Sequence, residues 1–144
     1  MIALEPVPGT VKVLNLNINL NGLRNIKVIP KAAWIGSSLL TIYLPKGYYG
    51  WASPVRWHGS KSFTVEAVPL DDICKKIPAI KLLKIDVEGS EDQVLKGAKE
   101  TLKKTKHIVL EVSGNSDEIR RILREATFKI RKLKFATYIH AQKS

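Results

Sequence analysis

One stretch limits what this chain can fold into: the apolar run IKLLKIDV (residues 80–87), followed at once by EDQVLKGAKETL (91–102). A nearly continuous apolar run of this length is typical of a strand covered on both faces. Ser90, with Gln93 three residues later, has the spacing of a capping box at the start of a helix. Four apolar residues then recur at helical spacing and predict its buried face: Val94, Leu95, Ala98 and Leu102. The stretch predicts a buried strand leading directly into a helix.

The same alternation of strand and helix continues along the rest of the chain. Apolar segments predict strands at residues 2–6, 25–33, 38–45, 62–68 and 107–113. Helices are expected at 10–21 and from Asn115 or Ser116 onward, and a short helix or turn at 69–77. Residues 14–21 also alternate as a strand would, but Asn is poor in strands and Asn21-Gly22 is a good helix stop. Segments 127–133 and 134–141 predict a terminal antiparallel hairpin, so the whole chain reads as an α/β fold.

This pattern predicts one mostly parallel sheet with helices on both faces. The 144 residues suit a single domain, and no linker or repeat divides them. With one cysteine and three scattered histidines, neither an internal disulfide nor a metal-ligand spacing is present. No apolar run approaches the length of a membrane span and no signal-peptide pattern opens the chain, so we expect a cytoplasmic protein.

The net charge of +11 attracts phosphates or other anions. A soluble, lysine-rich surface explains this charge equally well, and no known nucleic-acid motif accompanies it. The segment 47–60 is rich in glycine and aromatic residues, among them Tyr48, Tyr49, Trp51 and Trp57. It is interpreted as a substrate loop, an oligomer contact, or a loop folded over its own apolar residues.

Carboxylates follow three of the predicted strands: Glu5, then Asp86 and Glu88, then Glu111. Ligands of open α/β sheets bind at the carboxyl ends of the strands, so these acids are expected to converge on a site. A carboxylate after a strand can accept both hydroxyls of a ribose, and Glu5 has that position. Asp86 has the position to face a substrate or a cationic group.

A purely structural interpretation stays open beside this one. Asp86 and Glu88 could accept backbone N–H groups in the turn before the helix. Glu91 and Asp92 are explained by their place in the first turn of a helix, where the macrodipole favours negative charge.

The segments IALEPVPGTVKVLNLNINLNGLRNIKVIPKAAW, LDDI and LLKIDVEGSEDQVLKGAKETL, followed by HIVLEVS, together resemble the FkbM-type methyltransferases. The most specific element is KIDVEGSE followed by VLKGA. The resemblance implies a class I Rossmann-like fold and S-adenosylmethionine as the cofactor. It further implies methyl transfer, with a hydroxyl oxygen of a small molecule or glycan as the expected acceptor.

The resemblance also implies roles for residues of this chain. Glu5 would bind the cofactor ribose, the segment Ala32, Ala33 and Trp34 would lie near the adenine, and Asp86 would lie beside the reactive methyl group. Glu88 and Glu91 complete the acidic motif. Together with Asp86 they are expected to line the catalytic side of the site. No metal is required.

The chain departs from the family pattern at its amino-terminal side. Its sequence contains no G-x-G, whereas the family begins with a strand and a glycine-rich loop that holds the methionine part of the cofactor. The resemblance implies that this first strand would lie between residues 2–4 and 81–87. Without it, either these two strands pair directly or an apolar edge stays bare and recruits another chain as a homo-oligomer.

Two function classes follow from the sequence. The first is an FkbM-type methyltransferase domain that is truncated relative to the family and binds its cofactor weakly or not at all. The second is a basic Rossmann-like module without enzymatic activity that binds nucleic acid or a protein partner.

Overall fold

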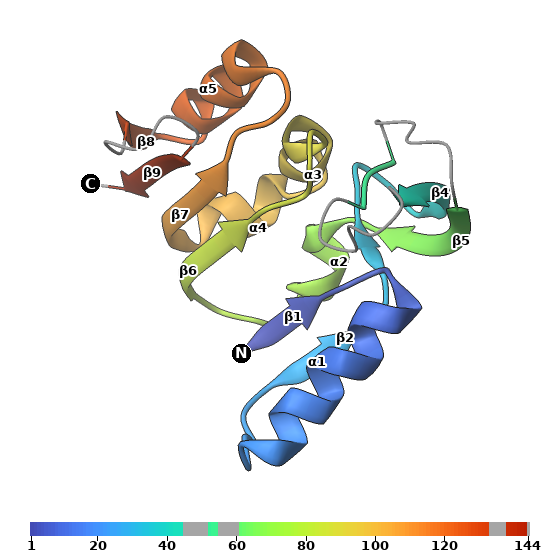
Figure 1. The fold of residues 1–144 in the computed structure, drawn as a ribbon. Helices are drawn as coiled ribbons and strands as arrows, with labels where there is room; N and C mark the ends of the chain where they lie inside the picture. Colours follow the sequence, from blue (N-terminus) through green and yellow to red (C-terminus); the bar gives the residue numbers. More distant parts are fainter. Residues whose placement is uncertain (45–51, 55–60, 133–137, 144) are drawn as a thin grey trace.

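The computed structural model describes residues 1–44, 52–54, 61–132 and 138–143 (Figure 1). Their strands form three sheets, with the orders β1-β2, β3-β5-β4 and β6-β7-β9-β8. Three of the six strand pairings are parallel and three are antiparallel. The α/β prediction is confirmed, but the single, mostly parallel sheet is replaced by three separate sheets among the described residues, one parallel and two mixed. No helix in this part of the chain is long and apolar enough to cross a membrane.

The first sheet is a βαβ unit made of β1 (Ile2–Leu4), α1 (Pro8–Leu20) and β2 (Lys27–Ile29). Its strands pair in parallel, and Figure 1 shows α1 running alongside them. The ambiguous segment is therefore a helix. It begins at Pro8 rather than Thr10, because proline has its φ fixed near the helical value and lacks only an N–H that needs no partner at that position. Gly22, with φ +63°, ends it as expected.

The second sheet contains β3 (Ala32–Ala33), β4 (Ser38–Leu44) and β5 (Lys61–Val68), and the four-residue helix α2 (Leu70–Ile73) follows it. The two longer strands are both found where they were predicted, and they pair antiparallel. The strand expected over residues 25–33 is two strands, separated at Pro30, which has no N–H to continue a ladder. The aromatic residues predicted to form a substrate or oligomer loop lie outside the described residues.

The opening stretch forms β6 (Ile80–Ile85), α3 (Glu91–Lys96) and most of α4 (Lys99–Lys103), and β7 (Thr105–Glu111) follows it. Strands β6 and β7 belong to the third sheet. The single predicted helix is thus two helices, which meet at Gly97. A Cβ atom on Gly97 would collide with the backbone carbonyl of Trp34, so the α3–α4 junction packs directly on the chain after β3.

The predicted capping box is wrong. Ser90 occupies the N-cap position, but its hydroxyl donates to the carbonyl of Val87 (2.8 Å), and the Gln93 side chain donates to Asp92 (2.9 Å). The next helix, α5 (Ser116–Glu125), is capped as expected, since Asn115 Oδ1 accepts the Glu118 N–H (3.2 Å). The terminal strands β8 (Phe128–Lys132) and β9 (Tyr138–Lys143) pair antiparallel and confirm the hairpin.

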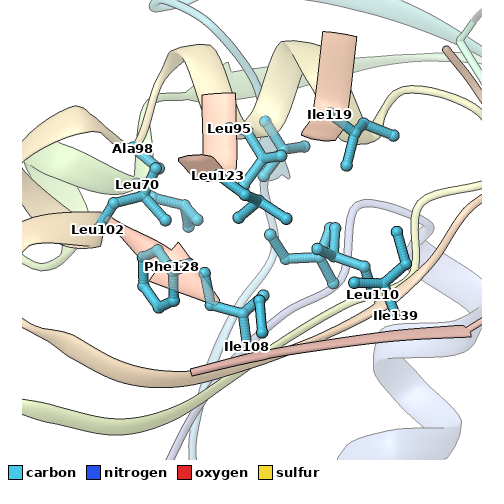
Figure 2. Close-up of a cluster of buried hydrophobic side chains, with 13 residues drawn as sticks. Leu70, Leu95, Ala98, Leu102, Ile108, Leu110, Ile119, Leu123, Phe128 and Ile139 are labelled. Carbon is cyan, nitrogen blue, oxygen red and sulfur yellow. The ribbon is translucent and has the colours of Figure 1, made fainter. Parts of the chain in front are cut away.

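The main hydrophobic cluster lies between one face of the third sheet and helices α3, α4 and α5 (Figure 2). The predicted helix face is part of it: Val94, Leu95, Ala98 and Leu102 are 1% exposed or less. From the sheet, Leu110 and Ile139 point into the same cluster. On the opposite face Leu82 is 57% exposed. The expectation that residues 80–87 are covered on both faces is therefore wrong, because these helices all lie on one side.

The sequence left open whether residues 2–4 and 81–87 pair directly with each other. In the structure these segments correspond to β1 and β6. Figure 1 shows β1 and β6 with their arrows pointing in the same direction. Within the described residues β1 pairs only with β2, and β6 pairs only with β7. The two strands do not pair with each other, so each has one edge without a strand partner among the described residues.

Candidate functional site

A cavity of about 550 Å³ lies between β1 and β6 and reaches their carboxyl ends. Backbone and side chains of residues 2–6 form one wall, and residues 83–88 form the opposite wall. The segment 31–34 and apolar residues of β4 complete it. Six of the seven sequence-predicted site residues line this cavity: Glu5, Ala32, Ala33, Trp34, Asp86 and Glu88. The convergence at the strand ends follows from the parallel course of β1 and β6.

Glu5 stands directly after β1 at the rim of the cavity. Its carboxylate accepts the backbone N–H of Val7 (2.8 Å), and the Glu5 N–H donates to Ile29 O (3.1 Å), so the residue is held at both ends. Burial raises the pKa of the Glu5 carboxyl, while the hydrogen bond from Val7 works in the opposite direction. A carboxylate has about four lone-pair sites, so one N–H partner leaves capacity for hydroxyl groups of a ligand.

The segment from Ala32 to Trp34 forms an apolar wall of the cavity. Trp34 N–H donates to Val68 O (3.0 Å), which extends the parallel pairing of β3 with β5 by one bond. Trp34 packs against the second hydrophobic cluster, which includes Ala32 and Ile42. This wall presents a small-residue surface on which a flat apolar ring can lie.

Asp86 and Glu88 form the acidic wall after β6. Asp86 is paired with Lys84 at 2.9 Å, and both residues line the cavity. Glu88 has φ +50°, a left-handed conformation uncommon for a residue with a side chain. Its carbonyl accepts the hydroxyl of Ser53, a fully buried residue 35 positions earlier in the chain (2.8 Å). This hydrogen bond therefore fixes the backbone of the turn after β6 to a residue outside the turn.

Glu91, predicted as a third acid of the site, does not line the cavity. It is 0% exposed, and its two carboxylate oxygens accept two backbone N–H groups, from Gly89 (2.9 Å) and from Gly114 (3.0 Å). These glycines belong to the turns that follow β6 and β7. A Cβ atom on Gly114 would lie 2.7 Å from Gly89 O, so the two turns touch. Glu91 thus joins the two strand-end turns.

Tyr138 and Glu111 add an element that the sequence did not reveal. Glu111, expected among the converging acids, lies opposite Tyr138 in the β7–β9 register and accepts its hydroxyl (2.6 Å). This hydrogen bond, burial, and the negative charges of Glu111, Asp86 and Glu88 all raise the pKa of Tyr138. The antiparallel register was the missing information, because Tyr138 is 27 residues from Glu111.

Asp71 was likewise missed. Its carboxylate accepts the N–H groups of Glu100 (3.1 Å) and Thr101 (2.7 Å) at the start of α4. It does for α4 what an N-cap residue does, from a segment 30 positions away. Among the described residues no group of His, Cys, Asp and Glu is arranged to hold a metal ion.

A βαβ unit, a sheet with helices on one face, and a cavity with acids at the strand ends define an α/β protein with a candidate ligand site at the carboxyl ends of its strands. The model of the methyltransferase FkbM domain matches residues 1–130, and the chain belongs to this family.

Two known proteins extend the comparison. The 2-O-methyltransferase NoeI of Sinorhizobium fredii (strain NBRC 101917 / NGR234) is 40% identical over 75 residues, which are 51% of this chain and 30% of that protein. The crystal structure of methyltransferase FkbM from Methylobacillus flagellatus KT has a TM-score of 0.64 at 17% identity. The match covers 97% of this chain and 36% of the other. The similarity of structure shows the fold, and the chain spans about a third of the length of these relatives.

Proposed function

We propose that the cavity binds the adenosine part of S-adenosylmethionine and serves methyl transfer to a hydroxyl oxygen of a sugar or other small molecule. The observation that carries this proposal is the convergence of Glu5, the Ala32–Trp34 wall and Asp86 on one cavity. The name of the similar 2-O-methyltransferase supports an oxygen as the acceptor atom.

The residues present fit the adenosine part of such a cofactor. Glu5 carries a carboxylate with capacity for two ribose hydroxyls at the rim. Ala32, Ala33 and Trp34 offer an apolar surface for an adenine ring. The methionine part finds no glycine-rich turn, because the sequence has no G-x-G. We therefore propose weak binding by these residues alone.

The chemistry divides between cofactor and chain. When bound, the cofactor supplies a methyl group already activated by a sulfonium, so the protein chiefly has to align the acceptor. In this proposal Asp86 accepts the proton of the acceptor hydroxyl, whose oxygen then takes the methyl group. Such general-base assistance contributes about 10²–10⁴-fold. Lys84 pairs with Asp86 at 2.9 Å and lines the same cavity.

The test is calorimetric titration of the 144-residue chain with S-adenosylhomocysteine, beside the variants Glu5→Ala, Asp86→Ala and Glu100→Ala. Glu100 is a matched control, because its side chain is 66% exposed and paired with Lys103 outside the cavity. Hydrogen bonds to a charged group contribute about 1.5–3 kcal/mol each, so Glu5→Ala is expected to weaken binding by about tenfold or more. Glu100→Ala is expected to bind like the parent chain.

The pH dependence gives a second readout. Ribose hydroxyls need Glu5 as the carboxylate, and its raised pKa means that protonation sets in at a higher pH than for an ordinary glutamate. Affinity is expected to fall on acidification from above pH 4.5, and this loss should be absent in Glu5→Ala. A folded chain that gives no heat with millimolar ligand, or equal affinity in all variants, would refute the proposal.

The net charge of +11 favours one second candidate, a module that binds nucleic acid. Its signature is binding to single-stranded RNA that weakens steeply with salt and is indifferent to S-adenosylhomocysteine. Fluorescence anisotropy with a labelled RNA at rising salt decides between the two functions.

A further inference from the structure

The outer side of helix α1 carries a row of exposed apolar side chains. Val13, Leu16 and Leu20 are 57%, 56% and 75% exposed. Residues three and four positions apart are neighbours on a helix surface, so these three lie in one line, and Gly9 continues the line toward the start of the helix. These four residues form the α1 stripe.

The α1 stripe lies opposite the side of the helix that the fold already uses. Two residues along a helix turn the side chain by about 200°, so Leu14 and Ile18 lie nearly opposite Leu16. Leu14 is half-buried and Ile18 is buried. Figure 1 shows α1 at the edge of the described part of the molecule, with its outer side away from the other helices. A helix that is apolar on opposite sides is typical of one that is covered on both.

Charge distinguishes the α1 stripe from the rest of this basic chain. The chain has 24 Lys and Arg residues and a net charge of +11. Among the 13 residues of α1, Lys12 is the one charged side chain. Asn17 and Asn19 flank the stripe by their helical positions, and a carboxamide both donates and accepts hydrogen bonds. Two copies can therefore meet along α1 without bringing many like charges together.

We propose that the α1 stripe is the contact of a homodimer, in which α1 packs antiparallel against α1 of a second copy. In a two-fold contact the same patch meets itself, so it has to be self-complementary, as an uncharged apolar row is. Antiparallel helices bring opposite ends of their dipoles together. With Leu16 at the two-fold axis, Lys12 lies opposite Leu20 rather than opposite its own copy. Leu23, which is 45% exposed just beyond α1, lies opposite Gly9, where the space for a side chain is open.

A second copy fits the α1 stripe better than a partner of different chemistry. A partner attracted by the net charge of +11 would be anionic, and its acidic groups would meet the basic surfaces rather than a helix side with almost no charge. The 13 residues of α1 span about 20 Å. Two helices of this length bury less than the roughly 1,200–2,000 Å² of a standard interface, so we expect a reversible dimer with a Kd on the order of 100 µM.

The test is sedimentation equilibrium of the 144-residue chain, at protein concentrations from about 10 µM to about 1 mM. The apparent mass should rise with concentration from that of a monomer toward that of a dimer. Raising the salt concentration from about 0.05 M to about 0.5 M should strengthen the association, because salt screens the repulsion between two copies of net charge +11. A contact held by opposite charges would weaken instead.

A pair of matched variants locates the contact. Leu16→Glu is expected to weaken the association by more than about 100-fold, because two like charges then meet at the axis. The change lowers the net charge by one, so the general repulsion between copies falls and cannot explain the loss. Leu82→Glu makes the same chemical change on β6 in a different sheet, at a leucine that is 57% exposed, and should associate like the parent chain.

A mixed sample distinguishes loss of the contact from damage to the fold. Leu16→Glu and Leu16→Lys should each stay monomeric and keep the circular dichroism spectrum of the parent chain. An equimolar mixture of the two should associate more strongly than either variant alone, because opposite charges then meet at the axis.

Three results would overturn the proposal. The first is a parent chain that stays monomeric at about 1 mM in high salt. The second is equal weakening by Leu82→Glu and Leu16→Glu, which would place the contact elsewhere. The third is a mixture that associates no more strongly than the separate variants. The dimer does not depend on cofactor binding, so none of these results bears on the calorimetric titration or on the proposed methyltransferase function.

Discussion

Replacing Glu91 tests whether its carboxylate connects the turns that follow β6 and β7. In Glu91→Ala the N–H groups of Gly89 and Gly114 lose their acceptor. A hydrogen bond to a charged group contributes about 1.5–3 kcal/mol. Both glycines are only partly buried, so water replaces part of the loss and the lower value applies to each. We expect a loss of about 3 kcal/mol in the free energy of unfolding, as the sum of two bonds.

The assay is urea unfolding followed by far-UV circular dichroism, with thermal unfolding beside it. For a chain of this size, about 3 kcal/mol lowers Tm by roughly 6–12 °C. Glu91→Gln keeps the shape and one acceptor, but it turns an amide donor toward a backbone N–H, so it should lie between the parent and Glu91→Ala. Glu100→Gln, a helical carboxylate that is 66% exposed, should change the free energy by less than about 0.5 kcal/mol.

The result that would refute this reasoning is equally concrete. If Glu91→Ala unfolds within about 0.5 kcal/mol of the parent chain, the two hydrogen bonds do not hold the turns together. If the variant is stable and yet loses affinity for S-adenosylhomocysteine, Glu91 contacts the ligand, which would restore its predicted place among the site acids.

Three further predictions concern single residues. Gly97→Ala should destabilise the chain by several kcal/mol in urea unfolding, because its Cβ would meet the backbone carbonyl of Trp34; Gly36→Ala, with open space around it, is the control. Asp71→Ala should cost about 1–2 kcal/mol through the lost cap of α4, and Asp71→Asn should recover part of it; equal stability of all three would contradict the cap. Hydrogen bonding to Arg121, opposed by desolvation and aided by Lys96, lowers the pKa of Glu118 to about 2. Its stabilisation is therefore complete above pH 4.5 and lost as the pH falls toward 2, so Glu118→Gln should flatten the acid limb of a Tm-against-pH curve.

The sequence was informative wherever the signal is local. Helix α5 was predicted with its cap, because Asn115 lies three residues before the N–H that it accepts. The six cavity residues were predicted through strand ends and the family resemblance. Both routes depend on where a strand ends. The end of a strand can be predicted from consecutive residues, as with Glu5 after β1.

Long-range partners could not be read in the same way. Ser90 and Gln93 have the spacing of a capping box, yet the Ser90 hydroxyl donates to the carbonyl of Val87, the Gln93 amide donates to Asp92, and neither side chain caps the helix. The role of Glu91 depends on Gly114, which is 23 residues away. The run 80–87 predicts an apolar strand, but it does not tell whether a second layer covers both faces of that strand. In the structure Leu82 is exposed.

The hydrogen bond from the Ser53 hydroxyl to the carbonyl of Glu88 has a consequence for movement. Ser53 is also bonded to Tyr43 in both directions, through its N–H (3.1 Å) and its carbonyl (3.0 Å), and so belongs to the edge of β4. The acidic turn after β6, which lines the cavity, is thereby tied to a strand of a different sheet. If the two sheets separate to admit a large acceptor, this bond has to break first. While this bond is intact, a movement of β4 also moves the acidic turn, so the spacing of the two sheets and the position of the carboxylates change together.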